Sequence, residues 1–167
     1  LAEALGLPED EVRMIELAAP LRGISKLGVS DAILLKPGKL DAAEMEQIRR
    51  HPRLGYDILS DSSSKFVQVG ATIALHHHER WDGSGYPDGL AGEDIPLSAR
   101  IVAVTDVLEA LTTERPYKEA WPMSQAFDYL KAQSGLQFDP AVIDALMARR
   151  DRIQEIFDFH APASAPR

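Results

Sequence analysis

Cysteine is absent from this chain of 167 residues. Its absence excludes disulfide bonds and thiolate metal sites, so any metal ion must be bound by His, Asp or Glu side chains. A chain without cysteine fits the reducing cytosol, and we expect a cytoplasmic protein. The sequence also contains no secretory hydrophobic region and no apolar run long enough for a membrane span.

Basic residues are outnumbered, with 18 Lys and Arg against 26 Asp and Glu and a net charge of -8. This balance excludes a general surface for nucleic acid or anionic membranes, because such surfaces are basic. An anionic ligand must therefore be met by a local cationic pocket. The 45% hydrophobic content, by contrast, is enough for one domain with a substantial core.

Strand-like alternation, internal repeats and sustained heptads are also missing, whereas apolar residues recur at helical spacing. We therefore predict an all-α fold, a compact helical bundle. We expect one domain over residues 1–160, with its first helix cut short because the chain is a fragment of a longer signalling protein. The Pro- and Ala-rich residues 161–167 are predicted to form a flexible tail.

Start and stop signals place the helices along the chain. Asp41 and Glu44 form a capping-box pattern, and His51-Pro52 is expected to interrupt the helix that this box opens. Residues 20–40 contain three glycines and two prolines and are predicted to be irregular. The predicted helices cover residues 9–19, 41–50, 52–60, 66–77, 97–113, 122–134 and 139–157.

Three consecutive histidines, residues 76–78, run into a glycine-rich loop. Imidazole is the commonest metal ligand, and His51, held before Pro52, is a further candidate. Adjacent His77 and His78 cannot share one helix face, but a site near a helix end can use both. Each histidine taken alone is more often a surface or capping residue, so the proposal of a metal site depends on their combination with a carboxylate.

Asp106 is the most informative carboxylate, because its predicted helix is apolar on all faces. A buried carboxylate is costly unless it binds metal or is paired. The alternatives are a salt bridge to Arg100 or Arg115, or exposure at the edge of the helix. Three histidines with this Asp would form a nitrogen and oxygen site that suits Fe, Mn, Zn or Ni without choosing among them.

The loop after the histidines, residues 82–89, has glycines where the backbone needs positive φ or close approach. The alternative is an ordinary helix C-cap and turn. The loop lacks the Lys-Ser/Thr pair that ends a phosphate-binding P-loop, which excludes a nucleoside triphosphatase of that type.

The segment His-His-Glu-Arg-Trp-Asp-Gly-Ser-Gly-Tyr-Pro at residues 77–87 closely resembles the hallmark of HD-GYP domains. Similar stretches make the resemblance extend over about residues 20–145. It implies an all-helical bacterial signal-transduction domain, often the output of a response regulator, whose active members hydrolyse cyclic di-GMP at a two- or three-metal centre. The further matching stretches are residues 33–40, 51–56, 95–107, 115–117 and 138–140.

The resemblance also implies roles for individual residues. It assigns Lys26 to the scissile phosphate region as the catalytic lysine. The loop that it implies for substrate, or for a diguanylate cyclase-type protein partner, contains Arg80, Gly85, Tyr86, Pro87 and Arg115. The metal ligands that it implies are His51, His77, His78 and Asp106.

The HD pair that defines the family is missing. Where the family pattern is Leu-His-Asp-Ile-Gly-Lys, residues 21–26 are Leu-Arg-Gly-Ile-Ser-Lys. The absent Asp is the ligand expected to bridge two metals, and Arg22 adds a permanent positive charge beside Gly23. We expect Arg22 to point toward Asp106 or a bound anion. The site should hold no metal or one divalent ion, with Fe, Mn or Ni as candidates, and an intact two- or three-metal centre is not expected.

Three functions follow, so the sequence leaves open whether the chain is an enzyme. The first, which we favour, is a degenerate HD-GYP signalling domain with phosphodiesterase activity lost or strongly impaired, which binds cyclic di-GMP, a related cyclic dinucleotide or a partner protein. The second is an active cyclic di-GMP phosphodiesterase with a reduced metal site. The third is a structural module that dimerises, as a homodimer, or connects neighbouring domains.

Overall fold

The computed structural model describes residues 1–36, 38–114 and 119–160, and their architecture confirms the all-α fold class. An isolated bridge pairs Ser134 with Phe138, and no β-strand occurs in these ranges. None of the helices in the described part combines the length and apolar character that crossing a bilayer requires.

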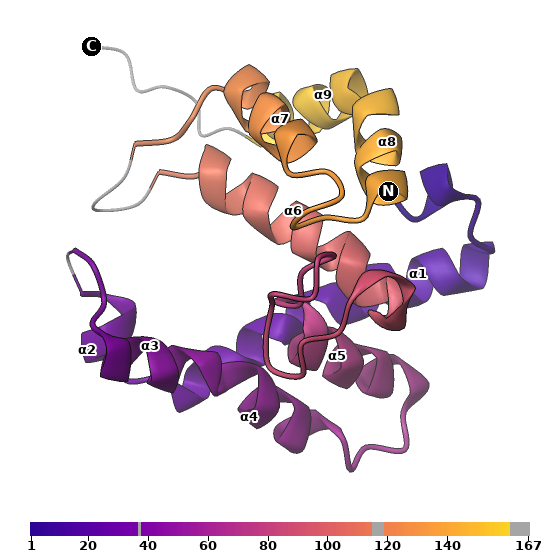
Figure 1. The fold of residues 1–167 in the computed structure, drawn as a ribbon. Coiled ribbons are helices and arrows are strands. Elements are labelled where there is room, and N and C mark those ends of the chain that lie inside the picture. The colour runs from indigo at the N-terminus through magenta and orange to yellow at the C-terminus, as the bar shows by residue number, and fades with distance from the viewer. Residues whose placement is uncertain (37, 115–118, 161–167) are drawn as a thin grey trace.

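Figure 1 shows the helices in chain order. In the text, 3-10 helices carry the symbol η. The longest, α6, has 16 residues. The elements are η1 (Glu3–Leu5), α1 (Glu9–Ala18), η2 (Ala19–Gly28), α2 (Asp31–Leu34), α3 (Ala42–Arg49), α4 (His51–Leu59), α5 (Lys65–His76), η3 (Gly92–Asp94), α6 (Leu97–Thr112), α7 (Met123–Ala132), α8 (Pro140–Ala148) and α9 (Arg150–His160).

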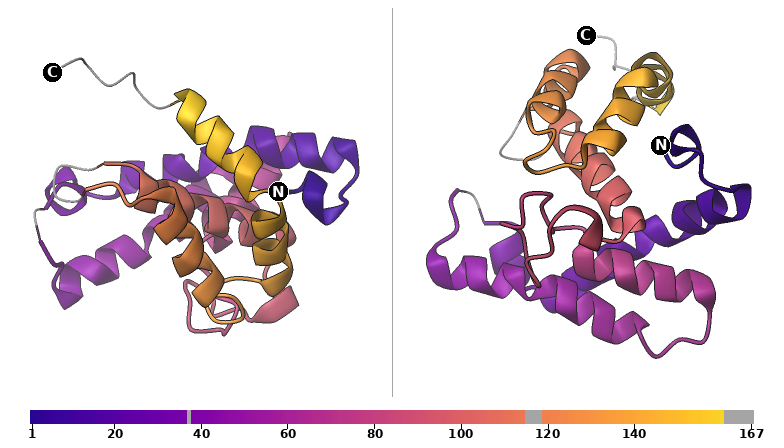
Figure 2. Two further views of the ribbon diagram at one scale, coloured as in Figure 1. Left: turned by 90° about the horizontal axis from the view of Figure 1, so that it is seen from above. Right: turned by 45° about the vertical axis from the view of Figure 1, so that its right-hand side comes forward.

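Two groups of helices are joined by α6. One contains α1 and α3 to α5, the other α7 to α9, and α6 runs between them in Figure 1 and in the right-hand view of Figure 2. The larger core packs α6 against α7 and α8, with Val104 and Leu130 fully buried. On another side of α6, Val102 packs against Ala18 of α1 and Ile73 of α5. Because α6 contributes to both cores, it fixes the position of one group relative to the other.

The predicted capping box is present at the start of α3. The Asp41 carboxylate accepts a hydrogen bond from the Glu44 amide at 2.9 Å, and the Glu44 carboxylate accepts one from the Asp41 amide at 2.8 Å. Helix α3 ends at Arg49 and α4 begins at His51, which confirms the expected interruption. Proline is tolerated at the second position of α4 because amides in the first turn need no helical partner.

Two predictions about the elements are wrong. Residues 20–40 are not irregular throughout, because the 3-10 helix η2 and the short helix α2 lie within this range. The α-helix α1 ends at Ala18, and Pro20 falls in the first turn of η2, where its fixed φ is compatible with a 3-10 helix. The single helix predicted for residues 139–157 is divided at Arg149, whose φ of -113° and ψ of 10° leave the helical region.

A very close approach between η2 and α4 brings the two elements of the site together. A Cβ atom added to Gly55 would lie 2.6 Å from the Cβ of Ser25, so only glycine fits this contact. Ser25 is fully buried, and its hydroxyl donates a hydrogen bond to the Arg22 carbonyl at 2.6 Å. The segment that carries Arg22 and Lys26 is therefore held directly against α4.

Candidate functional site

The ends of two helices bring three histidines together. His51 is the first residue of α4, whereas His77 and His78 follow directly after the last residue of α5. One ring nitrogen from each lies within 4.8 Å of the others, and the Nε2 atoms of His51 and His78 are 3.1 Å apart. Because His77 and His78 lie beyond the regular helix, neighbouring residues can face the same point, as the sequence predicts for a helix end.

Backbone carbonyls fix the orientation of two of these rings. The Nδ1 atom of His51 lies 2.5 Å from the Ile48 carbonyl, and that of His77 lies 3.0 Å from both the Ile73 and Ala74 carbonyls. A carbonyl only accepts, so Nδ1 carries the hydrogen and Nε2 keeps its lone pair. Hydrogen bonds of this kind orient metal-binding histidines in proteins.

Burial keeps the three imidazoles neutral. It is the main cause that lowers the pKa of His77 to about 4 and the pKa of His78 to about 3, and it also lowers the pKa of His51. Neutral imidazole is the form that binds metal, so at pH 7 no proton has to be displaced.

The three nitrogens lie close enough together that they could hold a metal ion. With ligand bonds of about 2.0 to 2.1 Å, neighbouring donors lie about 3.0 Å apart at right angles and about 3.4 Å apart in a tetrahedron. The separation of 3.1 Å between His51 and His78 falls between these values. Residues 21–26 contain no carboxylate that could bridge two ions.

Arg22 binds the carboxylate that the sequence suggested as a fourth ligand. Its Nε atom donates to Asp106 of α6 at 2.7 Å, and one terminal nitrogen lies 2.9 Å from Glu109 on the next turn of α6. Its other terminal nitrogen donates to the Ala19 carbonyl at 3.2 Å. The expected orientation of Arg22 toward Asp106 is confirmed. Arg22 therefore places a fixed cation at the carboxylate that the sequence predicted as a ligand.

Asp106 is half-buried rather than fully buried, and Arg22 is its partner. Of the alternatives considered, Arg100 pairs instead with Asp139 at 2.6 Å, and Arg115 lies outside the described residues. Burial by itself would raise the pKa of Asp106, but the hydrogen bond and the charge of Arg22 outweigh it and hold the pKa below its usual value. The carboxylate therefore stays ionised in the absence of metal.

Two further cations lie beside the histidines. Lys26, exposed in η2, is close enough for its charge to lower the pKa of His51 and of His78, in addition to the larger effect of burial. Arg49, at the end of α3, places its guanidinium carbon 5.8 Å from the centre of the Tyr86 ring. Lys26 and Arg49 therefore place positive charge beside the histidines, whereas the charge of Arg22 is offset by Asp106 and Glu109.

The loop after α5 packs on the histidines through Tyr86. The rings of Tyr86 and His78 are stacked with their centres 4.9 Å apart, and burial raises the pKa of Tyr86 to about 12. Gly85 lies so close to the preceding backbone that an added Cβ would be 2.4 Å from the Arg80 nitrogen. Close approach, one of the two expectations for these glycines, is thus present at Gly85. Pro87 is partly exposed beside Tyr86.

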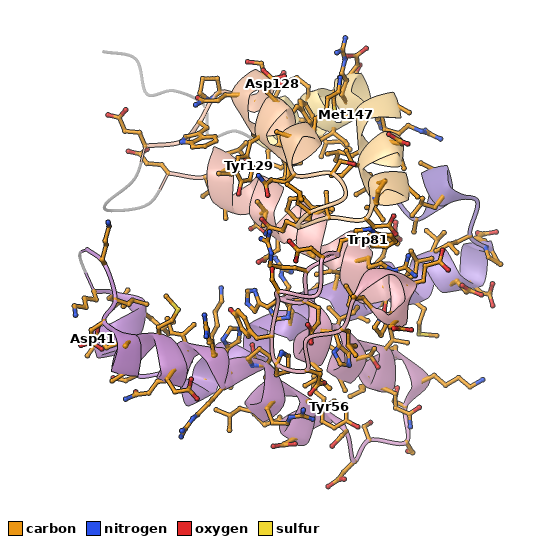
Figure 3. The ribbon with its side chains drawn as sticks, in the orientation of Figure 1. Asp41, Tyr56, Trp81, Asp128, Tyr129 and Met147 are labelled. Atoms are coloured by element: carbon orange, nitrogen blue, oxygen red, sulfur yellow. The ribbon has the colours of Figure 1, made fainter. Side chains whose placement is uncertain are left out.

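Other contacts tie this loop to the rest of the molecule. Trp81, labelled in Figure 3, donates its backbone hydrogen bond to the Gln137 carbonyl at 3.1 Å, and the guanidinium of Arg100 lies 5.8 Å from its ring centre. Arg80 turns back into the loop, where it donates to the Ser84 hydroxyl at 2.8 Å and lies 3.3 Å from Asp82. Arg80 is therefore occupied within the loop, and nothing in its contacts directs it to the histidines.

Sequence reasoning missed Arg49 and Glu109 as neighbours of the site. Arg49 stands two residues before His51 at a helix junction, and Glu109 lies one turn after Asp106 on the same helix. Their spacing from the predicted ligands was a usable signal. Surface Arg and Glu residues are so common in helices, however, that their side-chain directions could not be assigned from spacing alone.

Comparison with known proteins agrees with this geometry. A model of the HD domain family matches residues 1–142. The cyclic di-GMP phosphodiesterase response regulator RpfG of Xanthomonas campestris pv. campestris is 58% identical over 165 residues, which cover 99% of this chain and 44% of that protein. A cyclic di-GMP phosphodiesterase of Thermotoga maritima is 45% identical over 157 residues, 94% of this chain and 43% of that protein. The chain thus spans less than half the length of either relative.

Solved structures share the fold at low sequence identity. The 3'3'-cyclic GMP-AMP phosphodiesterase V-cGAP3 of Vibrio cholerae aligns over 93% of this chain and 42% of its own, with a TM-score of 0.67 and 18% identity. The HDG"Y"P protein Bd1817 of Bdellovibrio bacteriovorus aligns over 92% and 47%, with a TM-score of 0.69 and 19% identity. The family match, the shared fold and the loop at residues 77–87 show that the chain belongs to the HD domain family, as a member of the HD-GYP type whose own HD pair is Arg22-Gly23.

Proposed function

We propose that this domain binds a cyclic dinucleotide, such as cyclic di-GMP, and that its phosphodiesterase activity is lost or strongly impaired. The observation that carries the proposal is the 2.7 Å contact between Arg22 and Asp106. The positive charge at this carboxylate is supplied by a side chain, which cannot activate water as a metal does.

The reaction of metal-dependent phosphodiesterases explains why a guanidinium in place of a metal ion would impair hydrolysis. A bound divalent ion supplies a water of lowered pKa and neutralises charge on the phosphate. His51, His77 and His78 are the residues that would hold such an ion. Asp106 would have to share its charge between such an ion and Arg22, whose Nε already donates to Oδ1. The chain therefore retains part of a metal site without the bridging carboxylate of a two-metal centre.

The proposed ligand class is supported by charge and by the relatives. A cyclic dinucleotide carries two phosphodiester anions, and Lys26 and Arg49 place positive charge near the histidines of a chain whose net charge is -8. Relatives that cover most of this chain are named as phosphodiesterases of cyclic di-GMP or of 3'3'-cyclic GMP-AMP. A diguanylate cyclase-type partner for the loop at residues 80–87 stays a prediction, as does dimerisation.

An active enzyme with one metal is the second candidate. The three neutral imidazoles favour it, because their ring nitrogens lie within 4.8 Å of one another and need lose no proton to bind an ion. It differs from the first candidate in what Asp106 does: an enzyme would use this carboxylate at the metal, whereas a binding domain leaves it with Arg22.

The deciding experiment measures binding and turnover of cyclic di-GMP side by side, with Mn²⁺ or Fe²⁺ supplied. We expect the unmodified chain to bind the dinucleotide by calorimetry and to show no detectable hydrolysis. Arg22→His combined with Gly23→Asp should increase metal occupancy and produce hydrolysis. Gly23 has space for the new side chain, because an added Cβ meets no atom within 4 Å.

The matched control is Arg22→His with Gly23→Asn, which has nearly the same shape but no bridging carboxylate. It should remain inactive. Hydrolysis by the unmodified chain at ordinary enzyme rates, about 1 to 10³ s⁻¹, with loss of that activity in Asp106→Ala, would establish the second candidate instead. Absence of both binding and turnover would contradict both proposals.

A further inference from the structure

The three consecutive histidines do not all face the same cluster. His77 and His78 turn toward His51, whereas His76, the last residue of α5, turns toward Glu79 and Asp88. The Nδ1 atom of His76 lies 3.8 Å from a carboxylate oxygen of each. One nitrogen and two oxygens from these residues lie within 4.8 Å of one another. We call this group the His76 cluster.

The Nδ1 atom of His76 lacks the partner that burial normally requires, whereas the buried carboxylate of Glu79 accepts hydrogen bonds from backbone amides but has no Lys or Arg within 4 Å among the described residues. The Nδ1 atom of His76 is buried without a hydrogen-bond partner among the described residues. The side chain of Glu79 is completely buried. In the part of the chain that the structure describes, His76 alone brings a basic nitrogen within 4 Å of the Glu79 carboxylate. Buried carboxylates are costly unless they are paired or bind a metal, and unpaired buried nitrogens are rare.

The remaining contacts orient the two carboxylates. Glu79 accepts hydrogen bonds from the backbone amides of Asp88 at 2.8 Å and Leu90 at 3.1 Å. Arg53 of α4 donates to Oδ1 of Asp88 at 2.7 Å, while Oδ2 of the same group faces His76. Hydrogen bonds from outside a metal site hold its ligands in place in this manner.

We propose that the His76 cluster is a second cation site, separate from His51, His77 and His78, which takes one divalent transition ion such as Zn²⁺. Nδ1 of His76 and one oxygen each from Glu79 and Asp88 are the ligands. A nitrogen and oxygen set without sulfur suits Zn²⁺, and the separations of 3.8 Å have to close only to about 3.4 Å for tetrahedral geometry.

The site has a structural consequence for the loop. Glu79 and Asp88 stand on either side of residues 80–87, so an ion bound to both closes this loop and joins it to the end of α5. Tyr86 lies within the closed segment and stacks on His78. An ion in the His76 cluster would therefore hold one wall of the neighbouring histidine site in position.

Calorimetry with Zn²⁺ on metal-free protein tests this assignment. His51→Ala combined with His78→Ala removes the first cluster, which consists of His51, His77 and His78. We expect this variant to keep one equivalent of Zn²⁺. Adding Asp88→Asn should reduce that binding at least tenfold, because the amide is uncharged but can still accept from Arg53. Asp82→Asn is the matched control, since this exposed carboxylate of the same loop contacts Ser84 and Arg80 instead.

A second measurement works without changing the first cluster. In the otherwise unmodified chain, Asp88→Asn should lower the Zn²⁺ stoichiometry by one equivalent, and Zn²⁺ should slow amide hydrogen exchange at Asp88 and Leu90 only where Asp88 is intact. Equal stoichiometry and exchange with and without Asp88→Asn would overturn the proposal. So would loss of all Zn²⁺ binding when His51 and His78 alone are replaced in a folded protein.

Discussion

Arg22 changes the chemistry of the histidine site through one side chain. Its guanidinium keeps the half-buried Asp106 ionised, and it also reaches Glu109. A guanidinium remains protonated at any pH at which the protein is folded, so this pairing does not depend on bound ions. The same residue therefore accounts for the stability of the metal-free site and for the proposed loss of hydrolysis.

Arg22→Met should destabilise the protein and raise the pKa of Asp106. The substitution leaves a half-buried carboxylate without its cation, and loss of a hydrogen bond to a charged group costs about 1–3 kcal/mol. Urea unfolding at pH 7 measures the change in free energy. Glu109→Gln, at the exposed end of the same interaction, is the control and should cost at most about 1 kcal/mol. An equal loss of unfolding free energy in the two variants would show that the contact of Arg22 with Asp106 stabilises the protein no more than its contact with Glu109.

The site residues differ in how far the sequence could predict them. His51, His77 and His78 form one cluster as expected, because helix-end positions near a glycine loop converge. The approach of Arg22 to Asp106 was also foreseen from the missing HD pair. The orientation of His76 away from His77 and His78 was not foreseen. The backbone of the turn after α5 sets the direction of each ring, and no periodic pattern in the sequence predicts that backbone.

At the scale of elements, most residues of the site are positioned by the ends of helices. His51 begins α4, His77 follows α5, and η2 packs against α4 through Gly55. Helical spacing and capping residues predicted α3 to α7 closely. The 3-10 helix η2 escaped prediction because its proline and two glycines resemble a loop, and its conformation is stabilised by packing on α4 and α5.

Gly55→Ala should therefore separate η2 from α4. Alanine favours helix by about 1 kcal/mol over glycine, but its Cβ would lie 2.6 Å from that of the buried Ser25, and overpacking typically costs about 1–3 kcal/mol. We expect a net loss of stability in thermal unfolding, together with weaker ligand binding. Gly23→Ala, which meets no atom within 4 Å, serves as the control and should not be destabilised. An unchanged melting temperature for Gly55→Ala would contradict this account of the packing.

At the scale of the whole molecule, α6 links the site to both cores. Asp106 lies on the helix that buries Val104 in the larger core and Val102 in the smaller one. Asp106 also connects this helix to His51, His77 and His78, because its negative charge raises the pKa of all three histidines against the larger effect of burial. Protonation of the site should therefore affect the stability of the complete domain.

The metal-free protein should lose stability as the pH falls from about 6.5 to about 4. His77 and His78 have pKa values lowered chiefly by burial, to about 4 and about 3, so in this range the unfolded chain binds more protons than the folded one. The free energy of unfolding should fall by up to about 1.4 kcal/mol per pH unit for each histidine. Asp106 also has a lowered pKa, so its contribution is lost only at lower pH, below its ordinary value of 3.8.

Denaturant unfolding across this range measures the slope. His78→Gln should make it shallower, because one of the two groups no longer takes up a proton. A slope that is unchanged by this substitution would mean that other residues cause the acid sensitivity.

The pairing of Arg22 with Asp106 also bears on how the protein responds to its surroundings. A metal centre is filled or emptied according to supply, and chelators or starvation can remove its charge. The cation at Asp106 is synthesised with the chain and is present in every copy. The contact between η2 and α6 is therefore independent of nutrient metals, and under metal scarcity this part of the fold keeps its cation and its packing.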